Sequence, residues 1–501
     1  MAASTKQAQA PTPEQLQSVW GTLKSPRRLK TEVLAGLVVG LALIPEAIAF
    51  SVIAGVDPRI GLFAAFTMAV TIAFTGGRSA MISAATGAVA LVIAPLVRSH
   101  GVDYLIACVI LAGVIQIILA VSGVAKLMRF IPRSVMVGFV NALAILVFIA
   151  QLPELIGVPW LVYPMVLAAL LIMFVLPRFT QAVPAPLVAI VALTLVTVLG
   201  AIAVPTVGDK GALPDSLPTA VIPNVPLTFE TLQVIFPFAL AMAFVGLLES
   251  LMTAKLVDDI TDTRSNKTRE AWGQGVANIV TGFFGGMGGC AMIGQTMINV
   301  KASGARTRIS TFFAGVFVLL LVVVFGDVVS MIPMAALVAV MIFVCWATFD
   351  WHSIRLRTLK ALPKSETFVM VATVIATVAT NNLAIGVGTG TLLAMILFAR
   401  RVAHFVTVER IEGDSEVTYV VNGELFFASS NDLYTQFSYA LDPDRVIIDM
   451  RESHLWDAST SATLDAITDK YRRHGKDVEI VGLNDASTRM RERLAGKLGS
   501  P

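Results

Sequence analysis

Residues 285–308 read GGMGGCAMIGQTMINVKASGARTR, and this stretch decides how the chain is built. Five glycines stand at positions 285, 286, 288, 289 and 294. Because glycine costs about 1 kcal/mol in a helix interior, we expect a helix to begin only after the run. The apolar residues 293–303 are then too few to cross a membrane as a helix, which needs about 20. Part of this crossing must be extended chain, which is tolerated at that depth only where it is buried in protein or lines a cavity.

A second short stretch, residues 81–97, reads MISAATGAVALVIAPLV. We expect Met81–Ala85 to be extended and Thr86-Gly87 to open a short helix. Two such half-helices place two helix N-termini near mid-membrane, each with free N–H groups and roughly half a positive charge. Facing one another, they predict an anion site without a basic side chain. Close helix packing is the alternative role for the glycines.

The composition is that of a membrane protein. Apolar residues make up 56% and charged residues 14% of 501, and the mean hydropathy is +0.78. A water-soluble fold cannot bury so much apolar surface.

The three cysteines, Cys108, Cys290 and Cys345, suggest no disulfide or metal spacing, and we interpret them as small buried hydrophobes. Fourteen apolar segments can be delimited: 31–55, 58–75, 84–98, 103–122, 133–152, 161–177, 184–204, 234–255, 271–287, 293–303, 308–326, 333–349, 366–382 and 384–403.

Basic residues indicate the orientation of these segments, because cytoplasmic loops are rich in Lys and Arg. Residues 1–30 form a polar, basic segment without a signal-peptide pattern, and they predict a cytoplasmic N-terminus. Every second loop is then also basic; these loops hold Arg78, Lys126, Arg129, Arg178, Lys255, Arg264, Lys267, Arg269, Lys301, Arg306, Arg308, Arg355, Arg357, Lys360 and Lys364. The alternation persists through all fourteen segments and predicts a cytoplasmic C-terminus in a multi-pass protein of the inner (cytoplasmic) membrane.

The longest external connection, 205–232, follows the seventh segment. It divides the membrane part, 31–405, into seven plus seven, and an odd-numbered half forces the second half into the opposite orientation, as in inverted repeats. From 407 to 501 the composition is that of a small soluble α/β domain. There, 445–449 and 477–481 predict strands, 461–471 and 486–497 predict helices, and Asn422-Gly423 predicts a hairpin turn.

Two acidic residues lie inside apolar segments. Glu46 follows Pro45, which breaks the helical hydrogen-bond ladder, and Phe50 lies on the same face. We interpret Glu46 and Phe50 as cavity-lining, the alternative being a packing kink. Glu249 and Thr253, one turn apart, could hold Na⁺, or Glu249 alone could carry a proton; a structural hydrogen bond is the alternative.

Other chemistry is not indicated. The sequence has no Walker-type loop, HExxH or GxSxG motif, so neither an enzyme, a cofactor site nor a nucleic-acid partner is expected. Ser459, Thr460 and Ser461 stand at a loop-to-helix start, where N-capping is the plain interpretation and phosphorylation or an interaction the alternative.

The chain resembles the SulP (sulfate permease) family of anion transporters with a C-terminal STAS domain. The resemblance rests on LALIPEAIAFSVIAGVDPRIGLFAAF, GVAKLMRFIPRSVMVGF, LLES, GQGVANIVTGFFGG and NVKASGARTRIS, and in the soluble part on NGELFF, RVIIDMRE and WDAS. It implies a core of segments 1–4 and 8–11, a gate of segments 5–7 and 12–14, and a homodimer. It also implies regulatory proteins as candidate partners of the STAS domain.

The resemblance further implies a substrate between the third and tenth segments, bound by Thr86, Gly87, Ala88, Ile293, Gly294 and Gln295. Glu249 with Thr253 resembles the Na⁺ site of bicarbonate-transporting relatives. Many members carry an Arg early in the tenth segment, where this chain has Gln295 and Thr296.

Without that Arg, an anion lies beside the ionised Glu249, and a bound H⁺ or Na⁺ would relieve the cost of the uncompensated charge. We therefore expect symport of a small anion (bicarbonate, sulfate or a dicarboxylate) with the core sliding against the gate. The alternatives are an anion channel or exchanger on the same fold, a sensor that signals through the STAS domain, and nucleobase transport.

Overall fold

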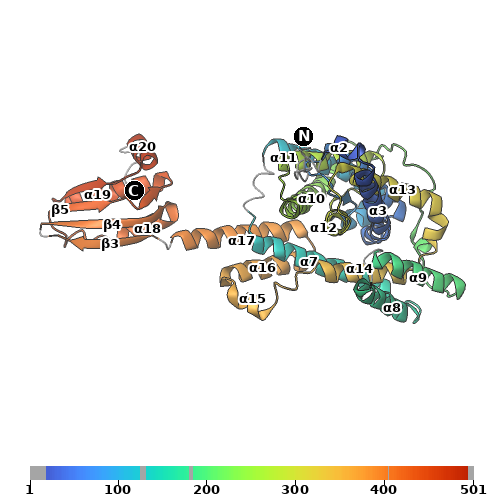
Figure 1. The fold of residues 1–501 in the computed structure, drawn as a ribbon. Helices are drawn as coiled ribbons and strands as arrows, with labels where there is room; N and C mark the ends of the chain where they lie inside the picture. Colours follow the sequence, from blue (N-terminus) through green and yellow to red (C-terminus); the bar gives the residue numbers. More distant parts are fainter. Residues whose placement is uncertain (1–17, 124–130, 180–183, 404–405, 414, 495–501) are drawn as a thin grey trace, which may run out of the picture. The chain divides into compact units, whose positions relative to one another are not determined.

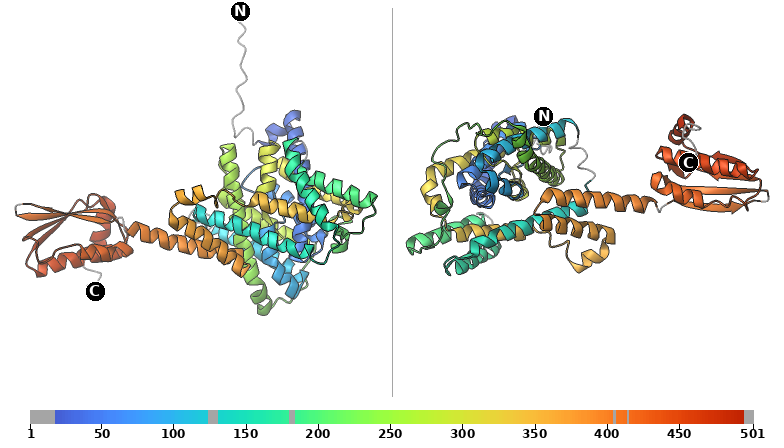
Figure 2. Two further views of the ribbon diagram at one scale, coloured as in Figure 1. Left: turned by 90° about the horizontal axis from the view of Figure 1, so that it is seen from below. Right: turned by 180° about the vertical axis from the view of Figure 1, so that it is seen from behind.

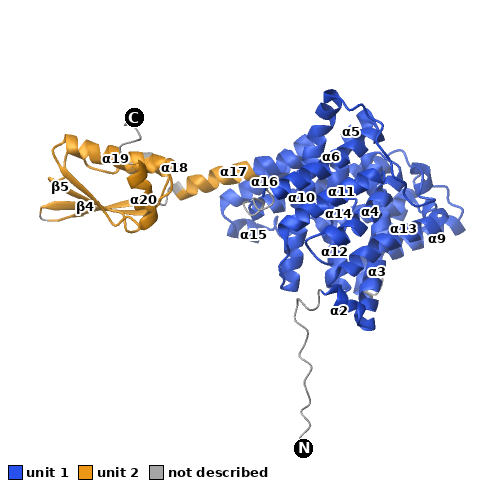
Figure 3. Cartoon of the chain, turned by 90° about the horizontal axis from the view of Figure 1, so that it is seen from above, with its two compact units in different colours: residues 1–390 blue, residues 391–501 orange. Residues whose placement is uncertain are grey.

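The computed structural model describes residues 18–123, 131–179, 184–403, 406–413 and 415–494. The chain forms two compact units, residues 1–390 and 391–501 (Figure 3). The division falls inside helix α17, Leu383–Ala403, whereas the sequence suggested a boundary after it. The predicted basic residues Lys126 and Arg129, and most of the N-terminal segment 1–30, lie outside the described residues.

Each predicted membrane segment of the first half corresponds to an element of unit 1 (Figure 1). Segments three, five and six are not single α-helices, because the third begins with the strand β1 and the fifth and sixth each end in a 3₁₀ turn. A short helix, α2 (Val19–Leu23), precedes the first segment. The elements are α3 (Pro26–Ala54), α4 (Pro58–Thr75), β1 (Ser83–Ala84), α5 (Gly87–His100), α6 (Val102–Val121), α7 (Arg133–Gln151), η2 (Leu152–Leu155), α8 (Val162–Val175), η3 (Leu176–Arg178), α9 (Ala185–Leu199) and η4 (Val207–Lys210).

The second half, whose helices run from yellow-green to orange in Figure 2, follows the same pattern. Its third crossing is again interrupted, here by β2 before α12. Its elements are α10 (Phe229–Thr261), α11 (Lys267–Phe283), β2 (Cys290–Ala291), α12 (Ile293–Met297), the π-helical turn η5 (Ile298–Ala302), α13 (Arg308–Ser330), α14 (Met334–Thr348), α15 (Leu356–Ala361), α16 (Lys364–Thr380) and α17. Within the described ranges, seven helices are long and apolar enough to cross a membrane: α3, α4, α6, α7 with η2, α10, α13 and α17. Four more apolar helices are shorter.

Helix packing repeats between the halves. Helix α3 packs on α13, and its counterpart α10 packs on α6; likewise α4 contacts α13, and α11 contacts α6. Helices α3–α6 and α10–α13 thus form one group, and α7, α8, α9, α14 and α16 form a second. The groups meet mainly through α3 with α14 and α5 with α7. Such pairwise correspondence is the pattern of an inverted repeat.

The two interrupted crossings meet in the interior of unit 1. Strands β1 and β2 pair antiparallel, with Ser83 opposite Ala291 and Ala84 opposite Cys290. The prediction of extended chain before both half-helices is therefore confirmed. Glycine is required at 289, because a Cβ there would lie 1.9 Å from the carbonyl oxygen of Ala84. Close helix packing, the alternative interpretation of the glycines, does not describe Gly289, whose near contact is with strand β1.

Proline 45 does not end the first helix. Helix α3 continues from Pro26 to Ala54 with Pro45 inside it, so the predicted break amounts to one missing hydrogen bond rather than an interruption.

In unit 2 the sheet has the strand order β3-β4-β5-β7, with β6 also paired to β4. The strands are β3 (Thr407–Glu412), β4 (Glu416–Leu425), β5 (Arg445–Asp449), β6 (Ser453–Leu455) and β7 (Asp477–Val481), and the helices are α18 (Phe427–Thr435), α19 (Ala458–Arg473) and α20 (Asp485–Leu494). Strands β3 and β4 are antiparallel, and the other pairs are parallel. The predicted strands 445–449 and 477–481 match β5 and β7.

The hairpin predicted at Asn422-Gly423 is wrong. Strand β4 runs straight through both residues, because its last three residues, 423–425, pair with β6. Its buried side chains alternate through Val417, Tyr419 and Val421, so a turn there would split one continuous core face.

The capping expected of Ser459–Ser461 is also wrong, since Asp457 caps α19 by accepting from the N–H of Thr460.

The close antiparallel pairing of β1 and β2 predicts that Gly289→Ala strongly lowers the stability of the protein. The added methyl group would meet backbone rather than a movable side chain, so we expect a loss of about 3 kcal/mol in stability, at the upper end of the usual cost of overpacking. Gly388→Ala in α17 is the matched control, because a Cβ there has no neighbour within 4 Å. Thermal melting of both variants in detergent checks this, and equal melting temperatures would contradict the close crossing.

Candidate functional site

A cavity of about 460 Å³ lies in unit 1 beside the crossed strands. The first helix group contributes to it from α3, α5, α10 and α12, and the second group faces them with α7, α9 and α14. The walls are mainly apolar. The lining residues are Glu46, Phe50, Thr86, Gly87, Phe139, Val140, Leu143, Ala144, Val147, Pro186, Glu249, Met292, Ile293, Gly294, Gln295, Met297, Ile298, Met341, Phe343, Val344, Cys345, Ala347 and Thr348.

Both half-helices begin at this cavity. Helix α5 starts at Gly87, and the hydroxyl oxygen of Thr86 accepts from the N–H of Val89 at 3.3 Å. Helix α12 starts at Ile293 and runs on into η5, and no side chain caps its first turn. Free N–H groups at the two helix starts give the cavity a positive potential beside the β1–β2 pair. The cavity thus combines two helix N-termini with apolar walls.

Eight of the ten residues singled out from the sequence line this cavity: Glu46, Phe50, Thr86, Gly87, Glu249, Ile293, Gly294 and Gln295. The other two do not. Ala88 is fully buried in α5. Thr253 is also buried, and its hydroxyl donates to the backbone oxygen of Glu249 at 2.8 Å rather than to the carboxylate.

The two carboxylates each have a neutral partner. The side chain of Gln295 lies within hydrogen-bonding reach of Glu46. The thiol of Cys290 donates to Oε2 of Glu249 at 3.0 Å. Among the described residues, no Lys or Arg lines the cavity. Any positive charge beside a ligand there comes from helix ends or from a bound cation.

Cys290 is fully buried, as predicted, but sequence reasoning missed its two polar contacts. Its sulfur lies 3.2 Å from the hydroxyl of Thr86 as well as 3.0 Å from Glu249. The available signal was its position, directly after the glycine run and before the half-helix. The walls from α7 and α14 were also missed, because apolar residues such as Phe139 and Val344 do not differ in sequence from lipid-facing ones.

Side chains from the surrounding helices provide hydrogen-bond partners for the extended backbone in and beside strands β1 and β2. Asn278 of α11 bonds both backbone groups of Gly289, at 2.9 and 3.1 Å. Ser250 of α10 accepts from the N–H of Ala291 at 3.0 Å. Thr296 accepts from the N–H of Ile82 at 3.0 Å. These bonds replace those that water would provide outside a membrane.

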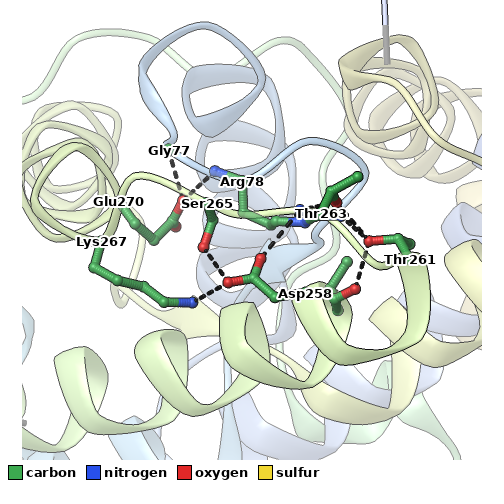
Figure 4. A network of polar contacts seen from close by, with 9 residues as sticks. Gly77, Arg78, Asp258, Thr261, Thr263, Ser265, Lys267 and Glu270 are labelled. Atoms are coloured by element: carbon green, nitrogen blue, oxygen red, sulfur yellow. Dashed lines mark hydrogen bonds and ion pairs between the residues drawn. The ribbon is translucent and has the colours of Figure 1, made fainter. Parts of the chain in front are cut away.

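A polar network holds the loop that leads into β1 (Figure 4). The guanidinium of Arg78 donates to Asp258 at 3.1 Å, to Thr263 at 2.8 Å and to Thr261 at 2.5 Å. Glu270 accepts from the backbone N–H groups of Gly77 and Arg78, at 2.7 and 2.9 Å. The loop before β1, in the first half, is thereby tied to the ends of α10 and α11 in the second.

Comparison with known proteins identifies two families along the chain. The model of the sulfate permease family matches residues 29–164 and 158–373, and that of the STAS domain matches 406–495. A Bacillus subtilis protein named "Putative sulfate transporter YbaR" is 53% identical over 93% of this chain and 97% of its own length. The bicarbonate transporter BicA of Picosynechococcus is 24% identical over 93% of this chain and 91% of its own length.

Solved structures share the fold. The transmembrane domain of a cyanobacterial bicarbonate transporter, BicA, aligns with a TM-score of 0.64 and 24% identity, covering 72% of this chain and 98% of that domain. The murine anion transporter Slc26a9 in the inward-facing state aligns with a TM-score of 0.81 and 16% identity, covering 98% of this chain and 92% of its own. The predicted fold class, a helical membrane part with a C-terminal STAS domain, is confirmed.

The Arg78 network predicts a difference between two substitutions at the same carboxylate. Arg78→Met removes a side chain that is 3% exposed together with its bonds to Asp258, Thr261 and Thr263, so we expect a loss of about 3 kcal/mol. Lys267→Gln removes the other cation of Asp258, which is 34% exposed, so we expect at most about 1 kcal/mol. Thermal melting in detergent measures both, and an equally small effect of Arg78→Met would show that the network does not hold the loop.

Proposed function

The chain belongs to the sulfate permease family, and from this premise we propose that it is a secondary active transporter that moves a small anion together with H⁺ or Na⁺. Its family consists of membrane anion transporters, not enzymes. The proposal assigns the anion to the cavity between the half-helices and the cation to Glu249.

The observation that carries the proposal is the meeting of two half-helix N-termini at one cavity that no basic side chain lines, within the residues described. The backbone N–H groups of Gly87 and Ala88 at one helix start, and of Ile293, Gly294 and Gln295 at the other, would hold the anion. Phe50 and the apolar walls would exclude water.

Coupling to a cation follows from charge. Glu46 and Glu249 also line the cavity, and an anion beside an ionised carboxylate in a site of low dielectric is costly. A cation at Glu249 removes one negative charge, so anion and cation bind more favourably together than apart. Na⁺ would use the carboxylate of Glu249 and nearby oxygens, and the Thr253 hydroxyl would contribute only after turning from its present acceptor.

The substrate class is a compact anion, and we propose bicarbonate, sulfate or a small dicarboxylate. Relatives carry names that refer to sulfate and bicarbonate transport. The absence of an Arg at Gln295 and Thr296 favours an anion other than sulfate.

We further propose that the first helix group, segments 1–4 and 8–11, is the moving core and the second the gate. Elevator-like sliding of the core would carry the anion across. The cavity residues Phe139, Pro186 and Thr348 stand near the helix ends that the basic residues assign to the cytoplasm, which supports an inward-facing state.

The same assignment of basic residues supports cytoplasmic termini in the bacterial inner membrane. The family supports a homodimer with the STAS domain as the regulatory part.

The anion site predicts that Gly294→Ala weakens anion binding without unfolding the protein. A Cβ at Gly294 has no neighbour within 4 Å, so it projects into open space at the start of α12. We expect the KM for the anion to rise about tenfold, as one added methyl group in a fitted site commonly produces, with an unchanged melting temperature. Uptake into proteoliposomes measures it; an unchanged KM would place the anion elsewhere.

The coupling predicts that Glu249→Gln abolishes cation-driven accumulation, because an amide neither takes up a proton nor carries charge for Na⁺. Glu230→Gln, an exposed position at the start of the same helix, is the matched control and should accumulate normally. The measurement is uptake of radiolabelled bicarbonate, sulfate and succinate into proteoliposomes under imposed H⁺ and Na⁺ gradients.

Normal accumulation by Glu249→Gln would refute the coupling. Conductance of wild-type protein without accumulation would instead favour the channel alternative on the same fold.

A further inference from the structure

We propose that Cys290 is a positioning residue that links cation binding at Glu249 to anion binding at Thr86, through a hydrogen-bond chain whose direction reverses. The inference rests on the proposed symport and adds the connection between its two sites. It starts from three side chains, of which two line the cavity and the third, Cys290, is fully buried between them.

The hydrogen bonds that join Thr86, Cys290 and Glu249 have a defined direction when no cation is bound. A thiol has one proton, and the Cys290 thiol donates it to Oε2 of Glu249 at 3.0 Å. The contact of 3.2 Å between the Cys290 sulfur and the Thr86 hydroxyl can then only be a bond that Thr86 donates. The lone pair of Thr86 meanwhile accepts from the N–H of Val89. In this state Thr86 has no proton left for an anion in the cavity.

A cation at Oε2 of Glu249 reverses the chain. A proton on that oxygen makes it a donor toward the Cys290 sulfur, and Na⁺ against it repels the thiol proton. The thiol proton then turns toward the oxygen of Thr86, which has a second lone pair for it. The hydroxyl proton of Thr86 is released and can turn into the cavity, where it donates to the anion. No covalent bond changes; only the two proton directions do.

The geometry gives the link its specificity. Cys290 lies opposite Ala84 in the β1–β2 pair, so the strand crossing fixes its distance from Thr86 two residues further along. Glu249 is presented from α10, which packs on both α5 and β2. The cation site and the anion site are thus joined by one side chain held by the strand pair that both half-helices share.

The test compares Cys290→Ala and Cys290→Ser in full-length protein in proteoliposomes. The readout is the KM for radiolabelled bicarbonate, sulfate or succinate, whichever wild-type protein carries, as a function of H⁺ and Na⁺ concentration. Cys108→Ala, a buried cysteine on α6 outside the cavity lining, is the control. Counterflow of the same anion without a cation gradient reports whether the anion site is intact.

Wild type and Cys108→Ala should show a KM that falls about tenfold as the coupling cation saturates, within the usual range of coupling between two sites. Cys290→Ala should show a KM that changes less than about twofold, lose accumulation and keep counterflow, because Thr86 is then always free. Cys290→Ser restores a donor and acceptor and should restore both the KM dependence and accumulation.

Three results would overturn the proposal: a cation-dependent KM in Cys290→Ala, loss of counterflow in Cys290→Ala, or failure of Cys290→Ser to restore coupling. These outcomes are separable from failure of the symport itself. If Glu249→Gln abolishes accumulation while Cys290→Ala retains it, symport stands and the link through Cys290 falls. If Glu249→Gln accumulates normally, the symport falls first.

Discussion

The need to satisfy backbone hydrogen bonds in a membrane interior governs the centre of this molecule. Two crossings are extended in their middle, and their exposed N–H and C=O groups would be costly without partners. The antiparallel pairing of β1 with β2 satisfies part of this need, and Asn278, Ser250 and Thr296 satisfy more. The pairing requires the close approach at Gly289, and it directs both half-helix N-termini to one cavity. Site and fold therefore depend on the same few hydrogen bonds.

The treatment of buried carboxylates separates structural from functional sites. Glu270 accepts from two backbone N–H groups and from Gln274, and Glu32 accepts from the N–H groups of Arg306, Thr307 and Ser310 at the start of α13. Each of these two carboxylates accepts three hydrogen bonds. Glu249 at the cavity has a weak thiol donor, which leaves room for a cation. A buried glutamate thus joins separate segments in one place and forms a candidate ion site in another.

Much of this arrangement could be predicted from sequence because membrane constraints are strong. Span length, the alternation of basic loops and the glycine run together indicate the segments and the two interruptions, whereas the residues at the start of α12 were implied by the resemblance to a known family. What sequence could not predict is contact between distant segments. The chain Thr86–Cys290–Glu249 joins three separate crossings, and the pairing partners of β4 turned an apparent hairpin signal into a straight strand. Local patterns carry no information on either.

The central claim is that a small anion is held by backbone N–H groups of two facing half-helices, without a basic side chain. The most direct test is an experimental structure determined with the transported anion bound. The account predicts anion oxygens within hydrogen-bonding distance of the N–H groups at the starts of both α5 and α12, beside Glu249. An anion bound instead to a Lys or Arg side chain, or away from the strand crossing, would contradict it.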